Sequence, residues 1–129
     1  MIYGVGIDIA SKERMKAAME RHPRIRERLF TPQEIAACER KGDPSASFAA
    51  RFAAKEAFFK AAGTGLGEGA RWTDIEVYGL ASGRPALRAT GAPARLLEDI
   101  GGVAHVSLTH DAGVAAAVCV IEVPDSRKD

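Results

Sequence analysis

Three parts of the sequence hold residues that could do chemistry together, and the first contains a lone acid. Asp8 is a carboxylate inside the apolar stretch Gly6-Ile7-Asp8-Ile9. A charge among β-branched residues is costly unless a cation or a hydrogen-bond donor satisfies it. The residue could point to solvent or cap a helix that starts near Ser11, or it could bind a metal or act as a general base. Taken alone, it favours the structural alternatives.

The second part is an Ala-rich stretch, residues 46–62, which lacks Gly and Pro and is followed by Gly63. At about 100° per residue, Phe48, Phe52 and Phe59 form one stripe and alanines cover most other sides, which predicts a helix buried on nearly every face. Its four charged side chains flank the phenylalanine stripe and are Arg51, Lys55, Glu56 and Lys60. They are either two solvated edges or the border of a pocket for a polyanion and a metal. The low polar content of the helix favours the pocket.

The third part lies near the end of the chain, in residues 104–111. In a strand, His105, Ser107 and Thr109 would share one face and alternate with apolar residues on the other. That polar face could supply hydrogen-bond donors or could simply contact water. Ser107 with a nearby His also suggests a nucleophile and its base, but no Gly-x-Ser-x-Gly elbow surrounds Ser107, which disfavours a serine hydrolase.

The glycine-rich loop of residues 63–69 is not typical of a nucleotide-binding loop. It follows a helix, whereas a P-loop or dinucleotide fingerprint follows a strand and opens a helix. No Cys/His spacing indicates structural zinc. The one kind of metal site that remains compatible with the sequence would hold a hard cation between Asp8, Glu56 and phosphate oxygens of a substrate.

Composition places these residues on one globular domain. The chain has 129 residues, 47% of them hydrophobic and 27% charged, with 18 basic against 17 acidic side chains. The longest apolar run, residues 112–121, is half of the roughly 20 residues that a membrane helix needs. The start of the chain lacks the pattern of a secretory signal, and two widely separated cysteines are typical of a reducing compartment. We therefore expect a cytoplasmic protein with no membrane segment and with two cysteines in the core.

The charges are unevenly distributed. Residues 11–28 contain seven basic and three acidic side chains, which predicts an acidic partner. A nucleic-acid-binding module is the alternative from another class of function. The pI of about 7.8 and the lack of aromatics within the basic segment disfavour it.

The elements that must position these groups follow from periodicity and capping signals. We expect strands over residues 2–9, 72–78, 85–89, 103–108 and 114–123, and helices over 12–21, 32–41, 46–62 and 93–100. This order predicts an α+β fold, a single domain in which a mostly antiparallel sheet packs against a long buried helix. The domain should span residues 1–123, followed by a frayed tail over 124–129.

Together, three motifs resemble the holo-acyl-carrier-protein synthases, the short bacterial type of 4′-phosphopantetheinyl transferase. They are Gly6-Ile7-Asp8-Ile9, the stretch from Phe48 to Ala61 that contains Arg-Phe-Ala-Ala-Lys-Glu-Ala, and His105-Val106-Ser107-Leu108-Thr109-His110. They occur in the family's order, and the resemblance runs from Met1 to about Val123.

The resemblance implies a Mg²⁺-dependent transfer of the phosphopantetheine arm of coenzyme A to a serine of apo-acyl carrier protein, with release of 3′,5′-ADP, for fatty acid biosynthesis. It implies that Asp8 and Glu56 bind the metal and that Lys60 contacts phosphate, with Glu56 or a metal-bound water as the general base. It also implies a set of coenzyme A contacts: Arg51, Lys55, Gly63, Thr64, Gly65, Arg84, Pro85, His105 and Ser107. In the segment Gly83-Arg84-Pro85, Arg84 stands where the family more often has Lys.

The resemblance further implies which partners the protein has. The acidic recognition helix of the carrier protein would dock on four basic side chains, Arg14, Arg21, Arg24 and Arg28. A homotrimer with active sites between subunits is expected, because only one copy of the fold is present. A coenzyme A binder without transferase activity is the second alternative.

Overall fold

The computed structural model describes residues 1–63 and 69–125. Its elements in chain order are β1 (Ile2–Ser11), α1 (Lys12–Arg21), α2 (Ile25–Leu29), α3 (Pro32–Glu39), α4 (Pro44–Ala62), the 3-10 turn η1 (Trp72–Asp74), β2 (Ile75–Gly79), β3 (Pro85–Ala89), α5 (Gly91–Ile100), β4 (Val103–Asp111) and β5 (Val114–Glu122). The predicted α+β class is confirmed. Residues 126–129 of the predicted tail lie outside the described residues.

Helix starts follow the predicted capping signals. The Ser11 Oγ accepts a hydrogen bond from the Arg14 N–H at 3.2 Å, and Thr31 and Glu34 form both arms of a capping box. The long helix α4 begins at Pro44, two residues before the predicted start, because Asp43 caps it. The short helix α2 after Pro23 is an element that the sequence pattern does not reveal, since five residues are too few to show a helical period.

The strands form two antiparallel sheets. One has the order β1-β5-β4, and the other is the β2–β3 hairpin. Residues 72–74, predicted as the start of a strand, form η1 instead, and β2 begins at Ile75. In the larger sheet Asp8 lies opposite Ala117 on β5, which in turn lies opposite Leu108 on β4. β1 and β4 are therefore the two edges of this sheet.

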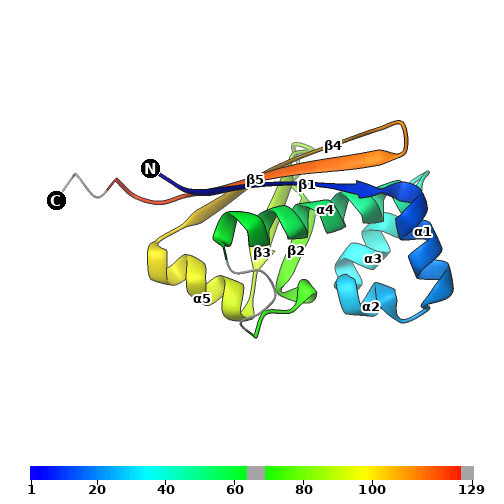
Figure 1. Ribbon diagram of the computed structural model, residues 1–129, viewed down its shortest axis with the longest axis horizontal. Helices are drawn as coiled ribbons and strands as arrows, with labels where there is room; N and C mark the ends of the chain where they lie inside the picture. The colour runs from blue at the N-terminus through cyan, green and yellow to red at the C-terminus, as the bar shows by residue number, and fades with distance from the viewer. Residues whose placement is uncertain (64–68, 126–129) are drawn as a thin grey trace.

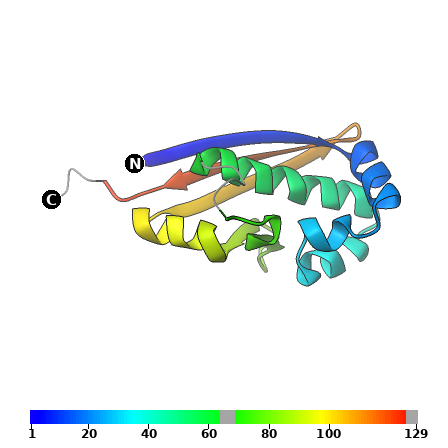
Figure 2. The ribbon, with the colours of Figure 1, turned by 60° about the horizontal axis from the view of Figure 1, so that its bottom comes forward.

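The helix α4 lies in the middle of the molecule, as predicted. The three-stranded sheet covers one side of it, while α5 and the β2–β3 hairpin lie on the other side and α1, α2 and α3 gather at one end (Figures 1 and 2). Twelve of its residues are buried, most of them Ala and Phe. Both cysteines are free and buried in the core. Within residues 1–63 and 69–125, no helix combines the length and apolar character needed to cross a bilayer.

The β1 backbone touches the α4 backbone through two glycines. A Cβ placed on Gly6 would lie 1.9 Å from the Ala57 carbonyl oxygen, and one on Gly4 would lie 1.9 Å from that of Ala61. No side chain fits in this gap, and only small residues face it from the helix. The two glycines and two alanines therefore set the distance between the strand that contains Asp8 and the helix that contains Glu56.

We predict that Gly6→Ala lowers the free energy of unfolding by about 2 to 3 kcal/mol, because the added methyl group must push strand and helix apart. Gly42→Ala is the matched control, since a Cβ there meets nothing within 4 Å. Chemical denaturation of both variants measures the difference. Equal stability of the two variants would show that the contact is not tight.

Candidate active site

Asp8 and Lys60 meet where β1 crosses α4. The Lys60 Nζ donates to Asp8 Oδ1 at 2.8 Å and to the Ile7 carbonyl at 3.1 Å. The Asp8 side chain is only 14% exposed, whereas that of Lys60 is 55% exposed. Asp8 raises the pKa of Lys60 through this hydrogen bond. The charge that the sequence analysis found inside an apolar strand is thus partly balanced by Lys60.

Glu56 lies one helical turn before Lys60 and faces the same carboxylate. Partial burial, together with hydrogen bonding to Asp8 and its negative charge, raises the pKa of Glu56 to about 7. The second oxygen of Asp8, Oδ2, is buried and accepts no hydrogen bond from any described residue. An unsatisfied carboxylate oxygen beside a second carboxylate needs a shared proton or a cation.

These groups fit a divalent cation of the magnesium type. Mg²⁺ is usually held by one or two carboxylates, with water and substrate phosphate oxygens completing its shell. Asp8 and Glu56 supply two carboxylates, and within the described residues no cluster of three or more His, Cys, Asp or Glu side chains could hold a metal. Two carboxylates alone would leave most of the shell of such an ion to water and substrate oxygens, and the predicted ligand pair stays a prediction.

The structure contradicts the predicted coenzyme A contact of Lys55. Its side chain is 0% exposed, and its Nζ donates to Glu34 Oε1 at 2.7 Å and to the backbone carbonyls of Trp72 and Ile75 at 3.1 and 2.6 Å. Burial lowers the pKa of Lys55, and the Glu34 carboxylate opposes that effect. The resemblance implied this contact from the motif alone, and a motif does not show what covers a side chain.

Arg51 is half-buried at the α3 side of α4. Its Nη1 donates to Ser47 Oγ at 2.7 Å, and Ser47 Oγ lies 3.3 Å from the Cys38 sulfur. The Arg51 Nε is buried and has no hydrogen-bond partner among the described residues. The predicted coenzyme A contact of Arg51 stays a prediction.

His105 and Ser107 do not join Asp8 in one chain. β4 alternates as predicted, with Ala104, Val106 and Leu108 packed against the core. The exposed His105 belongs to the opposite face of the sheet, where its Nε2 lies 3.1 Å from Glu122 Oε1. Asp8 lies on the α4 side of the same sheet. A single chain therefore separates the two polar groups that the sequence analysis brings into one site.

The remaining predicted coenzyme A contacts lie in turns. Arg84 and Pro85 follow the turn of the β2–β3 hairpin, where the Leu80 N–H donates to the Arg84 carbonyl at 2.8 Å. Gly63 ends α4 with a φ of 80°, a left-handed conformation that favours glycine. Thr64 and Gly65 lie outside the described residues.

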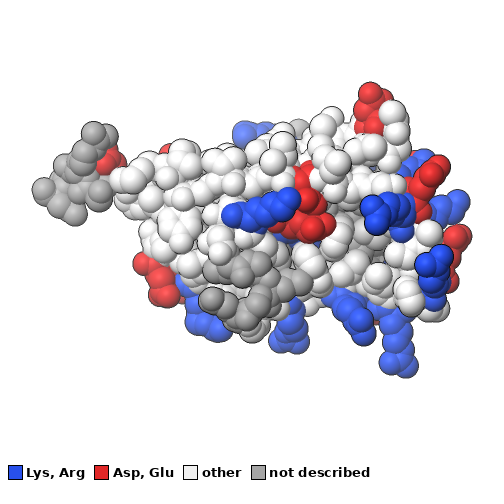
Figure 3. Space-filling view, viewed as in Figure 1, with Lys and Arg blue, Asp and Glu red and all other residues white. Residues whose placement is uncertain are grey.

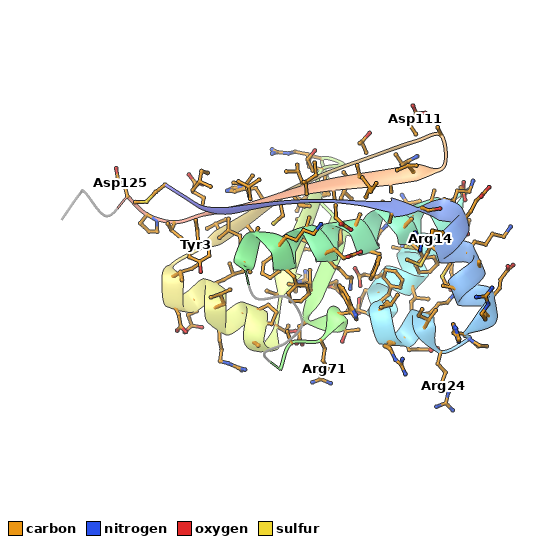
Figure 4. The ribbon with its side chains drawn as sticks, in the orientation of Figure 1. Tyr3, Arg14, Arg24, Arg71, Asp111 and Asp125 are labelled. Atoms are coloured by element: carbon orange, nitrogen blue, oxygen red, sulfur yellow. The ribbon has the colours of Figure 1, made fainter. Side chains whose placement is uncertain are left out.

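The basic segment remains mostly unpaired. Lys12 pairs with Asp43 at 2.6 Å and Arg26 pairs with Glu39 at 3.2 Å, whereas Arg14, Arg21, Arg24 and Arg28 have no ion pair in the described part of the chain. Arg14 on α1 and Arg24 beside α2 lie at the same end of the molecule (Figure 4). Basic side chains gather at that end and along the adjoining edge of the surface (Figure 3).

Two hollows lie beside the basic side chains of this end. One of about 530 Å³ is lined by Arg21, His22, Pro23, Arg24, Ile25 and Arg28. The other, of about 350 Å³, includes Arg14, Ile25, Phe52 and Glu56 in its lining. Ile25 lines both hollows, so the two adjoin each other, and Glu56 belongs to the lining of the second.

Two site-related residues escape the sequence analysis. Glu34 belongs to the capping box at the start of α3 and also pairs with Lys55. Glu122 carries no motif at all, and only the pairing of β4 with β5 brings it to His105. Neither contact leaves a local pattern in the sequence, because each joins segments that are distant along the chain.

Known proteins share both this sequence and this fold. Residues 4–119 match the 4′-phosphopantetheinyl transferase superfamily. The holo-[acyl-carrier-protein] synthase of Streptomyces coelicolor is 51% identical over 94% of this chain and 98% of that protein. The crystal structure of the Neisseria meningitidis synthase superimposes with a TM-score of 0.87 at 33% identity, covering 95% of this chain and 99% of that one. The Helicobacter pylori synthase, solved in complex with coenzyme A, gives 0.80 at 32% identity over 92% and 99%. The chain therefore belongs to the holo-[acyl-carrier-protein] synthases of the 4′-phosphopantetheinyl transferase superfamily.

Proposed function

We propose that Asp8, Glu56 and Lys60 form the catalytic centre with which this synthase transfers 4′-phosphopantetheine from coenzyme A to a serine of acyl carrier protein. The observation that carries this assignment is the buried, unpartnered Asp8 Oδ2 beside Glu56, with the Lys60 ammonium 2.8 Å from the other Asp8 oxygen. The serine hydrolase and nucleic-acid alternatives have no comparable support.

The reaction makes one phosphorus–oxygen bond and breaks another. The serine oxygen attacks the phosphorus that bears pantetheine, and 3′,5′-ADP leaves with the electrons of the broken bond. Displacement at phosphorus depends mostly on positioning and charge neutralisation. The serine proton must pass to a base, and Glu56 is the candidate for this role among the residues of this site.

The site residues would contact different anionic groups of coenzyme A. A Mg²⁺ ion bound by Asp8 and Glu56 would neutralise negative charge that develops on the phosphate oxygens. Lys60 has a mostly exposed ammonium, which can reach a diphosphate oxygen and still remain near Asp8. Arg51, whose side chain is only partly buried, would bind another anionic group of coenzyme A.

The apolar outer face of the sheet supports the proposed homotrimer. Val5, Ile7 and Ile9 on β1 are 59%, 65% and 67% exposed, and exposed apolar strands of this kind favour association. The sheet ends at β1 on one side and at β4 on the other. A closed ring that places β4 of one copy near β1 of the next would bring His105 and Ser107 to Asp8 and Glu56.

The arginine-lined hollow supports docking of the carrier protein. Arg14, Arg21, Arg24 and Arg28 carry unpaired positive charge, and the lining of the adjoining hollow reaches Glu56. An acidic helix on these arginines would therefore place its serine near the catalytic carboxylates. Such charges act chiefly on the rate of encounter and on its salt dependence.

We expect Asp8→Ala and Glu56→Ala each to lower the rate of transfer by at least about 100-fold, because each removes a metal ligand without adding bulk. Intact-mass analysis of an apo-acyl carrier protein incubated with coenzyme A and Mg²⁺ measures the product, and EDTA should abolish the gain in mass. Glu98→Ala, an exposed carboxylate of α5, is the control and should leave the rate unchanged. Near-normal transfer by either site variant contradicts the metal assignment.

Charge reversal tests the docking surface. Arg14→Glu/Arg21→Glu should raise the KM for carrier protein about tenfold and leave the KM for coenzyme A unchanged, since only the protein partner loses attraction. Arg95→Glu, on the exposed side of α5, is the control: it reverses a charge away from the docking surface and should leave both KM values unchanged. Unchanged kinetics in the double variant would place the docking surface on another face.

Mixing of inactive variants tests the shared site. If Asp8 and His105 act from different copies, Asp8→Ala and His105→Ala proteins should regain activity when mixed under conditions that exchange subunits. Light scattering should give three times the 13.7 kDa chain mass for the parent protein. Ile7→Lys, which puts charge on the apolar face, should lower that mass. No recovery on mixing would indicate that each chain acts alone.

A further inference from the structure

The long helix α4 has no strongly preferred rotation about its own axis on hydrophobic grounds. Its buried residues are mostly Ala and Phe and occur on nearly every side. A helix with one apolar stripe is oriented by burying that stripe, but a helix that is apolar all round gains almost the same burial at several rotations. Directional contacts must therefore select the one rotation at which Glu56 faces Asp8.

Lys55 supplies such a contact. Of the charged side chains on α4, which lies wholly within the described residues, only Lys55 is fully buried. Its ammonium has three acceptors, Glu34 Oε1 and the Trp72 and Ile75 carbonyls, at 2.6 to 3.1 Å. These acceptors come from α3, η1 and β2, so the contact ties α4 to three other elements.

Glu34 is itself fixed from two further directions. The Thr31 N–H donates to its Oε1 and the Val77 N–H to its Oε2, both at 2.9 Å. Thr31 Oγ1 also donates to Glu76 Oε2 at 2.6 Å. Both carboxylate oxygens of Glu34 are therefore satisfied, and the partner of Lys55 cannot move without breaking backbone hydrogen bonds.

The position of Lys55 on the helix connects this pair to the active site. Residues 55 and 57 are about 200° apart around a helix, so Lys55 lies nearly opposite Ala57, the residue against Gly6. Glu56 falls between them, about 100° from each. The glycine contact fixes one side of α4 and the ion pair fixes the other, which leaves Glu56 directed toward Asp8.

We propose that the buried Lys55–Glu34 pair is a positioning device that fixes the rotation of α4 and thereby holds Glu56 in the geometry needed to bind a divalent cation with Asp8. The proposal rests on the proposed function of Asp8 and Glu56. A buried ion pair is seldom a net source of stability, since removing two charges from water costs about as much as their attraction returns. The geometry of the Lys55–Glu34 pair supports a role in orienting α4.

The double variant Lys55→Met/Glu34→Gln tests the proposal. It removes both charges together, so neither remains buried alone, and the amide oxygen can still accept one backbone N–H. Two properties are measured well below the unfolding temperature: the dissociation constant for Mn²⁺, used as a paramagnetic probe, and kcat and KM for both substrates. We expect the Mn²⁺ dissociation constant to rise at least about fivefold and kcat to fall at least about tenfold, with both KM values within about twofold.

A destabilised control separates orientation from simple loss of stability. Leu96→Ala removes core packing at α5 and leaves the ion pair intact, so it should lower the unfolding temperature without changing kcat or Mn²⁺ affinity. Unchanged kcat and Mn²⁺ affinity in the double variant would overturn the proposal and leave a purely structural pair. If the parent protein itself fails to bind Mn²⁺, the metal site of the proposed function is at fault instead.

Glu34→Asp provides a second test that does not depend on the double variant folding. It keeps both charges but withdraws the carboxylate by one methylene group. Kcat and Mn²⁺ affinity should fall in the same direction as in the double variant, by a smaller factor. Parent-like values for both quantities in a folded Glu34→Asp protein would also overturn the proposal.

Discussion

The close approach of β1 to α4 is the constraint on which the rest of the structure depends. The Gly6 backbone lies against the Ala57 carbonyl, so strand and helix are separated by less than the width of a side chain. Asp8 and Lys60 can meet at 2.8 Å only because their parent elements are this close. The glycines and alanines of this contact have no chemistry of their own, yet they determine where the reactive groups lie.

Small residues on α4 leave the rotation of the helix poorly defined, and the buried Lys55–Glu34 pair defines it. An Ala-rich helix packs closely on every side, but its uniform surface does not define its orientation. The Lys55–Glu34 pair is directional and fully hydrogen-bonded, so it favours one arrangement over others of similar burial. Close packing sets the distance between strand and helix, and the ion pair sets the rotation.

Local signals made most of the fold predictable, whereas the site depended on contacts between distant segments. Ser11 and Gly63 marked helix ends because capping depends on neighbouring residues. Asp8 and Glu56 stand out in the sequence because a charge in an apolar setting is conspicuous, and their role as metal ligands stays a prediction. Lys55 looked similar in sequence, but its partner Glu34 is 21 residues away, so only the folded chain distinguishes a buried structural cation from one that could meet phosphate.

The sheet separates polar groups of this chain that the family resemblance places in one site. Side chains alternate between the two faces of a strand, so residues on one face of β4 cannot reach α4 on the other without crossing the sheet. His105 lies on the outer face and Asp8 on the α4 face, and no rotation of either side chain changes this. The outer face is also rich in exposed apolar residues on β1. Association through that face would bury this apolar surface, and the β4 residues of a neighbour would reach Asp8 only around the β1 edge of the sheet.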